Sequence, residues 1–275
     1  MKSFLKGIII GIGGIAPGLS GSVLMVILGL YTKVINTIAN LFKNFKKNML
    51  FLIPIGIGMI FGIVCFSKLI KHSMENYEIQ TRLAFFGLLI GTIPLFYKEV
   101  TKKETPKKEH FFLMIVAFIF GLYFLTFSST NQNSADLNIL QSFILGFCGI
   151  SAMIIPGLDG AALLSALGLY DNWLDLTSLD SSISIYIPAF IGIVTAGFLL
   201  SIIINKLLKK NYTVTFSILF GLFLSIVPSV LKTSEGTFIS IENSSSTYIG
   251  ILLFIGGILF SYLFSKLKKE EETSH

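Results

Sequence analysis

The chain has 275 residues, of which 53% are hydrophobic and 13% charged, and its net charge is +6. Soluble domains carry about 25% charged residues, so this composition excludes an ordinary cytosolic enzyme, a disordered chain and a nucleic-acid-binding domain. The 21 basic residues stand in groups between apolar stretches, which is typical of the cytoplasmic flanks of membrane helices. Cys65 and Cys148 lie inside apolar runs and indicate neither a disulfide framework nor a metal site. The composition therefore predicts a polytopic membrane protein.

The first apolar segment, Leu5–Tyr31, is interrupted at its centre by Pro17-Gly18-Leu19-Ser20-Gly21. Lys2 and Lys6 precede an apolar stretch as in a signal peptide, but no small-residue cleavage site follows, and we expect the segment to be retained. Proline and glycine interrupt the helical hydrogen-bond ladder, and each arm is too short to cross a hydrocarbon layer of ~30 Å. We predict a re-entrant hairpin or broken helix here, with a single kinked transmembrane helix as the alternative.

Six further segments are apolar enough to cross a bilayer, and one more is interrupted. The six spans cover approximately residues 48–67, 83–97, 111–127, 184–205, 214–230 and 248–265. The interrupted segment, Leu140–Tyr170, carries Pro156-Gly157-Leu158-Asp159-Gly160 at its centre. Freed backbone groups at membrane depth have to be buried in protein or face water, so we predict a second re-entrant hairpin. The expected fold is all-α, with six transmembrane helices and two re-entrant hairpins.

The two interrupted segments are related by a shift of 139 positions, and a shift of 134 continues the similarity into the spans that follow. The matched pairs include Pro17 and Pro156, Gly29-Leu30-Tyr31 and Gly168-Leu169-Tyr170, Pro54 and Pro188, and Phe86-Gly87 and Phe220-Gly221. We infer a duplication, with a first repeat over residues 1–136 and a second over 137–275. Three spans per repeat is an odd number, so the second repeat is expected to be inverted. An inverted-topology repeat with broken helices is typical of transporters that bind substrate near the bilayer midplane.

The lysine groups predict the orientation of the chain. They lie before the first span, between spans two and three, between spans four and five, and after span six: Lys43–Lys47, Lys98–Lys108, Lys206–Lys210 and Lys266–Lys269. Placing all four groups in the cytoplasm puts both termini in the cytoplasm and the acidic loop Asp171–Asp180 outside. One loop, with Lys68, Lys71 and Arg82, does not follow this pattern.

Several of these motifs resemble a known family. Pro-Gly-x-Ser-Gly followed eight residues later by Gly-Leu-Tyr, the second Pro-Gly copy, and Phe-Gly-Leu-Leu-Ile-Gly-x-x-Pro over residues 86–94 resemble the bacterial polyprenyl-phosphate (undecaprenyl-phosphate) transporters, the PopT-like family formerly described as a domain of unknown function. The resemblance covers essentially the whole chain. It implies a flippase of the bacterial cytoplasmic membrane that returns undecaprenyl phosphate, a lipid carrier of cell-wall sugars, from the outer to the cytoplasmic leaflet.

The chemistry of such a substrate indicates which residues bind it. An anionic phosphate is costly to move through lipid, so the protein has to supply fixed donors. Helix N-termini that follow the two breaks offer backbone N–H groups, glycines let the backbone approach, and hydroxyls add donors. The expected phosphate-binding residues of the breaks are Gly18, Ser20, Gly21, Ser22, Gly157 and Gly160. Alternatively these glycines only permit close helix packing, as expected at the pairs Gly7/Gly11, Gly58/Gly62 and Gly87/Gly91.

Four other side chains are candidates. Arg82 is the single arginine and suits bidentate phosphate binding, although it is equally consistent with an interfacial anchor. Asp159 is the only carboxylate in either hairpin, so it is expected to carry a coupling H+ or Na+, or else to cap a helix. Tyr31 and Tyr170 are expected to line the cavity, or to anchor helix ends at the interface.

Two other classes of function stay open. One is a secondary transporter or channel for a different anion, and the other is an intramembrane serine hydrolase that uses Ser20. A hydrolase needs a histidine base within the membrane, whereas His72, His110 and His275 are expected in loops or at the terminus. We therefore expect no enzyme, no metal, no cofactor other than the coupling ion, and no nucleic-acid partner. A homodimer among membrane lipids is the assembly left open.

Overall fold

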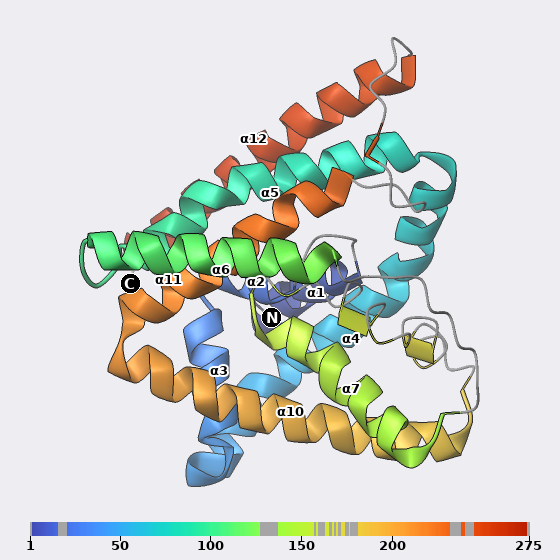
Figure 1. Ribbon diagram of the computed structural model, residues 1–275, viewed down its shortest axis with the longest axis vertical. Helices are drawn as coiled ribbons and strands as arrows, with labels where there is room; N and C mark the ends of the chain where they lie inside the picture. Colours follow the sequence, from blue (N-terminus) through green and yellow to red (C-terminus); the bar gives the residue numbers. More distant parts are fainter. Residues whose placement is uncertain are drawn as a thin grey trace.

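The computed structural model describes residues 2–15, 21–126, 137–156, 181–231, 238–239 and 245–273, with 158, 163–164, 167, 169, 172–173 and 176 between them. This part of the chain is almost entirely helical (Figure 1). Its elements are α1 (Lys2–Ile15), α2 (Gly21–Ile27), α3 (Tyr31–Ala39), η1 (Leu41–Asn44), α4 (Phe45–Asn76), α5 (Glu78–Val100), α6 (Lys108–Thr126), α7 (Ile139–Ile154), α10 (Ile183–Lys210), α11 (Tyr212–Ile226), η2 (Val227–Leu231) and α12 (Ser245–Thr273).

The spans expected from the sequence fall on helices, with 214–230 divided between α11 and η2 and residue 127 outside the described residues. Most of these helices are longer than the expected spans. α4 ends nine residues after the span 48–67, and α5 begins five residues before the short span 83–97 and ends three residues after it. The 23 residues of α5 give about 35 Å of helix, enough to cross the hydrocarbon layer. Within the described residues, length and composition alone qualify four helices as membrane-spanning, or five if the bent pair α2–α3 is one span. The presence of six spans stays a prediction.

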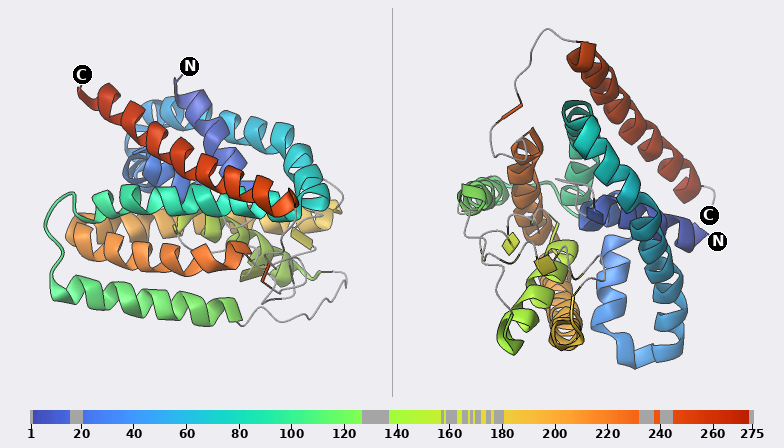
Figure 2. Two further views of the ribbon diagram at one scale, coloured as in Figure 1. Left: turned by 90° about the horizontal axis from the view of Figure 1, so that it is seen from above. Right: turned by 90° about the vertical axis from the view of Figure 1, so that its right-hand side faces the viewer.

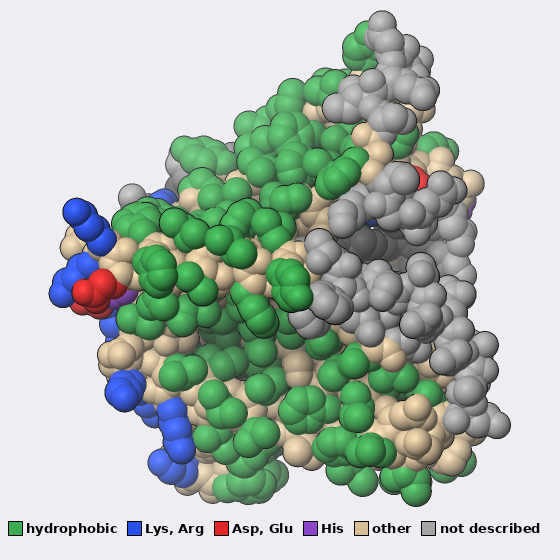
Figure 3. All heavy atoms as spheres, in the orientation of Figure 1, with side chains coloured by type: hydrophobic (Ala, Val, Ile, Leu, Met, Phe, Trp, Pro, Cys, Tyr) green, Lys and Arg blue, Asp and Glu red, His purple; other side chains and the backbone are tan. Residues whose placement is uncertain are grey.

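The exterior of the helix assembly is apolar, as expected for a surface in contact with lipid. Phe112 on α6, Phe190 on α10 and Leu252 on α12 are 65–68% exposed. Figure 3 shows hydrophobic side chains spread over most of the described part of one face. An apolar surface this large would cause a soluble protein to aggregate. The chain is a multi-pass membrane protein.

The core lies between α5 and α11, which run roughly parallel to α6 and α10 and appear nearly end-on in the right-hand view of Figure 2. Phe96 on α5 is completely buried and contacts Phe216, Phe220 and Phe223 on α11, with ring centroids 5.1–6.2 Å apart. Tyr31 at the start of α3 meets the edge of the Phe216 ring at 6.1 Å. This aromatic core therefore ties the start of α3 to α11, while the rest of α3 packs on α10.

Helix pairs in the first half of the chain have counterparts in the second half. α1 packs on α4 as α7 packs on α10, and α5 packs on α12 as α11 packs on α6. The contacts are made at glycines, where a side-chain carbon would overlap the backbone of the facing helix. In two cases equivalent glycines meet equivalent residues under the shifts of 139 and 134: Gly7 meets Ile55 as Gly146 meets Ala189, and Gly58 meets Phe4 as Gly192 meets Phe143. The equivalent glycines Gly87 and Gly221 also lie against backbone, at Phe254 of α12 and Met114 of α6.

This exchange of partners joins the two halves into one body. The last helix of the first half, α6, packs on α11 of the second half, while α12 packs on α5 of the first half. Close approach at glycine strengthens helix association in lipid, where no hydrophobic driving force exists between helices. Because each half needs a helix of the other, we do not expect either half to fold alone.

Lysines gather at one edge of the assembly. The α5–α6 connection and the α10–α11 junction lie at the same edge in Figure 1, and Figure 3 shows basic side chains along it. The lysines of these two segments are Lys98, Lys102, Lys103, Lys107, Lys108, Lys206, Lys209 and Lys210. The two groups, more than 90 residues apart in the sequence, thus face the same side of the bilayer that the helices cross. We call this side the lysine-rich edge.

Candidate functional site

The first interrupted segment forms two helices that lie beside each other. α1 ends at Ile15 and α2 begins at Gly21, and residues 16–20 between them, which include Gly18 and Ser20, lie outside the described residues. A side-chain carbon added at Gly21 would lie 3.1 Å from the Ile10 carbonyl oxygen. In one continuous helix residues 10 and 21 would be about 16 Å apart along the axis. α2 therefore begins beside α1 and does not continue along its axis. That the segment is a re-entrant hairpin stays a prediction.

Of the residues expected to bind phosphate in the breaks, Gly21 and Ser22 are described. Both are buried in the first turn of α2. Gly157, Asp159, Gly160 and the cavity candidate Tyr170 lie outside the described residues, as do Gly18 and Ser20. Their expected roles therefore stay predictions.

The Gly-Leu-Tyr motif ends α2 and redirects the chain. Gly29 has φ 67°, a left-handed conformation that glycine adopts without strain. The Gly29 N–H donates to the Val26 carbonyl at 3.0 Å and the Leu30 N–H to the Met25 carbonyl at 2.8 Å, which is the Schellman pattern of a helix C-terminus. The chain then bends by 113° into α3.

The second copy of this motif makes the equivalent backbone bond. The Leu169 N–H donates to the Leu164 carbonyl at 2.8 Å, and these residues correspond to Leu30 and Met25 under the shift of 139. The Trp173 N–H donates to the Leu169 carbonyl at 3.1 Å, as that of Val34 donates to the Leu30 carbonyl. The motif is therefore a duplicated signal that ends one helix and starts another.

Tyr31, the last residue of the first motif, reaches the second break. Its side chain is 1% exposed, and its hydroxyl donates to the Ile154 carbonyl at 3.1 Å. Ile154 is the last residue of α7, two positions before the buried Pro156. Proline has no N–H to continue the helix, so the terminal carbonyls of α7 need other partners. Tyr31 supplies one of them and ties α3 to the end of α7.

Arg82 is buried at the start of α5. Its Nη2 and Nε lie 2.8 and 2.9 Å from Oε1 of Glu78, and its Nη1 donates to the Val230 carbonyl at 3.3 Å. These partners lie on α5 and η2, and none of them belongs to either break. The structure thus gives Arg82 a packing partner across the core, in addition to the phosphate or interfacial role expected from the sequence.

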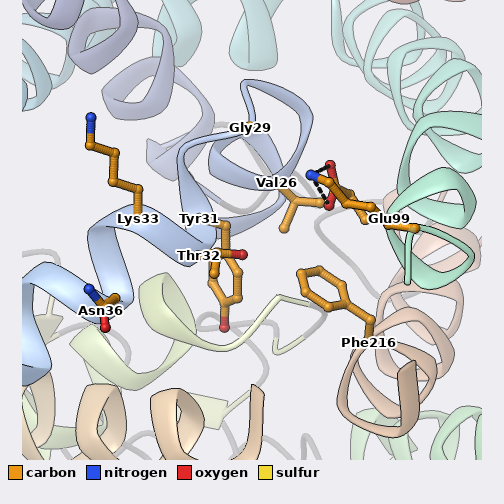
Figure 4. A pocket seen from close by; sticks show the side chains of 9 residues that line it. Val26, Gly29, Tyr31, Thr32, Lys33, Asn36, Glu99 and Phe216 are labelled. Atoms are coloured by element: carbon orange, nitrogen blue, oxygen red, sulfur yellow. Dashed lines mark hydrogen bonds and ion pairs between the residues drawn. The ribbon is translucent and has the colours of Figure 1, made fainter. Parts of the chain in front are cut away.

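A cavity that the sequence did not indicate lies at the lysine-rich edge, beside the start of α3 (Figure 4). Its volume is about 310 Å³. The lining comes from the end of α2, the exposed face of α3, the end of α5 and one ring of α11: Val26, Gly29, Tyr31, Thr32, Lys33, Asn36, Glu99, Lys102 and Phe216. Figure 4 shows Glu99 and Phe216 facing α3 across this space.

Glu99 is the acidic group of the cavity, and two partners hold it in place. Its side chain is 12% exposed, lies 3.1 Å from Nζ of Lys102, and accepts a hydrogen bond of 2.8 Å from the Tyr212 hydroxyl. Tyr212 also makes a side-chain hydrogen bond with Thr32. This network joins α3, α5 and α11. The signal in the sequence was a carboxylate at the end of a span, but nothing in the sequence showed what it would meet.

The comparison with protein families assigns the chain. The model described as "Undecaprenyl phosphate translocase-like" matches residues 39–187, more than half of the chain. The chain belongs to the undecaprenyl phosphate translocase-like family. The matched region runs from the end of α3 to the start of α10 and includes Arg82 and the second break.

Two relatives of this family member are named polyprenyl-phosphate transporter. That of Staphylococcus aureus is 28% identical over 284 aligned positions, which cover 98% of each chain. That of Vibrio cholerae is 25% identical and covers 86% of this chain and 79% of its own. No solved structure is significantly similar to this chain.

The hydrolase alternative needs a histidine base within the membrane, and two of the three histidines lie in the described part of the chain. His72 lies in the last turns of α4 and His110 in the first turn of α6, so the expectation that both lie in loops is wrong. Both helices extend beyond the predicted apolar spans and include these polar positions. Nδ1 of His110 accepts the Lys107 N–H at 2.9 Å. Within the described residues, no group of three or more His, Cys, Asp or Glu side chains could hold a metal ion.

Replacing Tyr31 with phenylalanine should lower the thermal stability of this protein. The substitution leaves the ring packed on Phe216 but removes the donor to the buried Ile154 carbonyl, and an unpaired buried carbonyl costs about 1–3 kcal/mol. The measurement is thermal unfolding of the purified protein in detergent. Tyr262→Phe, at an exposed position of α12, is the control and should change nothing. Equal stability of all three proteins would show that the Tyr31 bond contributes nothing.

Proposed function

We propose that this protein transports a polyprenyl phosphate across the bacterial cytoplasmic membrane and returns undecaprenyl phosphate from the outer to the cytoplasmic leaflet. The observation that carries the proposal is the similarity, over 98% of both chains, to a protein named polyprenyl-phosphate transporter. The apolar exterior and the membrane-spanning helices fit a protein whose substrate has its tail in lipid. We also propose that both termini face the cytoplasm, because the lysine-rich edge is then the cytoplasmic side.

The proposed path for the phosphate lies between the two Pro-Gly breaks. We propose an inverted repeat of six spans with two re-entrant hairpins, in which movement of one half against the other exposes the path to each leaflet in turn. Three observations support this plan: the start of α2 beside α1, the matching helix pairs of the two halves, and the bond from Tyr31 to the end of α7. The phosphate contacts proposed in the breaks are Gly18, Ser20, Gly21, Ser22, Gly157 and Gly160, with Arg82, Tyr31 and Tyr170 along the path.

Leaflet exchange in proteoliposomes tests the proposal. Vesicles containing a labelled prenyl phosphate are treated with an external phosphatase, which hydrolyses only the substrate in the outer leaflet. The protein should make the inner-leaflet pool accessible, and vesicles without protein should protect it. A labelled prenyl alcohol is the control for general disturbance of the bilayer.

The same vesicles separate the alternatives. A carrier of a water-soluble anion would move inorganic phosphate or sulfate while leaving the leaflet distribution of the prenyl phosphate unchanged. A hydrolase would release a cleaved membrane substrate in the absence of phosphatase, and Ser20→Ala would abolish that release. Either result would overturn the proposed function.

We propose that Asp159 carries the coupling ion, H+ or Na+. If protonation of this carboxylate accompanies transport, Asp159→Asn should flatten the dependence of the transport rate on pH, because the amide does not titrate. If Na+ is the ion, the same substitution should abolish the response of the rate to a sodium gradient. The measurement is the initial transport rate against pH and against sodium gradient, with Asp171→Asn as the control. Unaltered responses in Asp159→Asn would leave this residue only a capping role.

A further inference from the structure

We propose that the cavity at the start of α3 binds the phosphomonoester head of a prenyl lipid on the lysine-rich side of the membrane. The inference rests on the proposed function for the source of the phosphate, and it adds a site that lies outside the two breaks. It assigns the binding to Lys33, Asn36 and Thr32 on α3 and to Lys102 after α5.

The cations of the cavity suit a phosphomonoester. Lys33 and Lys102 both line it and come from segments almost 70 residues apart. Nζ of Lys33 lies 4.5 Å from the centre of the Phe51 ring, and Figure 4 shows this side chain directed away from Glu99, so Lys33 has to turn from the ring to meet a ligand in the cavity. A third lysine, Lys103, lies over the Tyr212 ring at 4.8 Å. A phosphomonoester carries about −1.5 to −2 charges at neutral pH and is best held by more than one cation.

Neutral donors complete the lining on one face of α3. Thr32, Lys33 and Asn36 are exposed on the side that faces the cavity, while Val34 and Ile35 are buried on the opposite side. The left-handed turn at Gly29 brings the first turn of α3 to the cavity wall, where Asn36 offers an amide to phosphate oxygens and Thr32 can turn its hydroxyl from Tyr212 to the ligand. The helix bend therefore determines which side chains meet the lysines.

The negative charge of Glu99 disfavours binding of an anion, and the contacts of Glu99 explain how the site can bind a phosphate in spite of this charge. The Tyr212 hydroxyl and Lys102 both bind the carboxylate, so Lys102 is held at the cavity before any ligand arrives. When a phosphate enters, Lys102 can turn to it while Tyr212 continues to hold Glu99. Lys33, Lys102 and Glu99 together leave one net positive charge, and Lys103 raises this to two. A cationic ligand would meet this excess of positive charge, so the site selects anions.

The apolar part of the cavity favours a lipid head over free phosphate. Val26, Tyr31 and Phe216 form one wall, and about 310 Å³ is the size of a small ligand site and larger than a phosphate group alone. The wall can contact the first isoprene unit next to the phosphate. α2 has seven residues, about 10 Å of helix, and separates the first break from the cavity. A head that leaves the break toward the lysine-rich edge would arrive here.

Binding to the purified full-length protein in detergent tests the site. The probes are farnesyl phosphate, farnesol and inorganic phosphate, titrated calorimetrically. The pocket variant is Lys33→Gln with Lys102→Gln. The matched control is Lys209→Gln with Lys210→Gln, which removes the same charge from exposed positions of the same edge. A third variant, Asn36→Asp, adds a negative charge at an exposed position with little change in shape. Thermal unfolding verifies that each variant is folded.

The pocket variant should bind farnesyl phosphate about tenfold more weakly, or weaker still. One charge-assisted hydrogen bond is worth about 1.5–3 kcal/mol, and 1.4 kcal/mol corresponds to tenfold in affinity. Asn36→Asp should also weaken the binding of farnesyl phosphate. The matched control should weaken it by less than about twofold. The binding of farnesol should be the same in all variants. Weak binding of inorganic phosphate that is lost in the pocket variant also supports the site. Binding of inorganic phosphate as tight as that of farnesyl phosphate would assign the cavity to free phosphate and overturn the lipid assignment.

Equal effects in the pocket variant and the matched control would overturn the proposal, because the binding would then be to the edge as a whole. Unchanged binding in both would overturn it as well. The proposed function is judged separately by leaflet exchange of the unmodified protein. If exchange occurs but the pocket variant binds normally, the site is wrong and the transport proposal stands; if no exchange occurs, the transport proposal itself fails.

Discussion

Gly58→Ala should greatly reduce the thermal stability of this protein, whereas Gly56→Ala, two residues earlier on the same helix, should leave it unchanged or slightly raise it. A side-chain carbon at Gly58 would overlap the Phe4 carbonyl of α1, and backbone of a packed helix cannot move aside cheaply. Gly56 has nothing within 4 Å of the same position. Overpacking costs about 1–3 kcal/mol, while alanine in place of glycine favours a helix by about 0.5–1 kcal/mol.

The measurement is the melting temperature of both variants in detergent, with detection of aggregation. Gly257→Ala and Gly256→Ala repeat the comparison on α12, because a carbon at Gly257 would lie 2.7 Å from the Ala84 carbonyl oxygen of α5 and Gly256 has nothing within 4 Å. We expect Gly58→Ala to weaken the α1–α4 contact and Gly257→Ala to weaken the α5–α12 contact. If the contact and open glycines of a pair respond alike, close backbone approach is not what stabilises that contact.

Arg82→Ala should reduce transport by about tenfold or more and also lower stability by about 1–3 kcal/mol. The stability loss arises because Glu78 and the Val230 carbonyl each lose the hydrogen bond from Arg82; the Glu78 side chain is 31% exposed, so water relieves part of the cost. The transport loss follows from the proposed role of the guanidinium in recognising phosphate, which a fork of donors suits.

Glu78→Gln separates the two contributions. It breaks the same ion pair but keeps the guanidinium, so it should lower stability comparably and transport much less. The measurement is initial leaflet-exchange rate per folded protein, together with the melting temperature. Equal loss of transport in Arg82→Ala and Glu78→Gln would reduce Arg82 to a residue that packs α5 against η2.

The positions of the helices could be predicted because they depend on local features. Apolar length identifies the spans, and proline and glycine mark where a helix must stop, so α1 ends before Pro17 and α7 ends before Pro156. The glycine spacing also indicated contacts, since Gly7 and Gly58 lie against the backbone of the facing helix. These signals need no knowledge of which helix is the neighbour.

The cavity and the bond from Tyr31 to Ile154 could not be predicted because they depend on the three-dimensional arrangement. The bonded residues are 123 positions apart, and an aromatic residue at a helix end fits an interfacial anchor equally well. The predicted hairpin ends at Tyr31 and the first predicted span begins at 48, so the sequence does not indicate α3, the separate amphipathic helix that begins after the left-handed turn at Gly29. α3 packs mainly on α10, and only the three-dimensional arrangement places its start opposite the end of α5 and Phe216 of α11, so that Lys33 and Glu99 line one cavity.

Crosslinking of the two breaks tests the central claim, that the phosphate passes between them. Leu19→Cys and Leu158→Cys occupy matching positions of the two copies, in a chain whose Cys65 and Cys148 are replaced by alanine. A short, reducible thiol crosslinker should join the two cysteines and stop leaflet exchange of the prenyl phosphate, and reduction of the crosslink should restore exchange. In the control, Leu158→Cys paired with Lys209→Cys should not crosslink. A crosslink that leaves exchange unimpaired, or two reactive cysteines that never join, would contradict a path between the breaks.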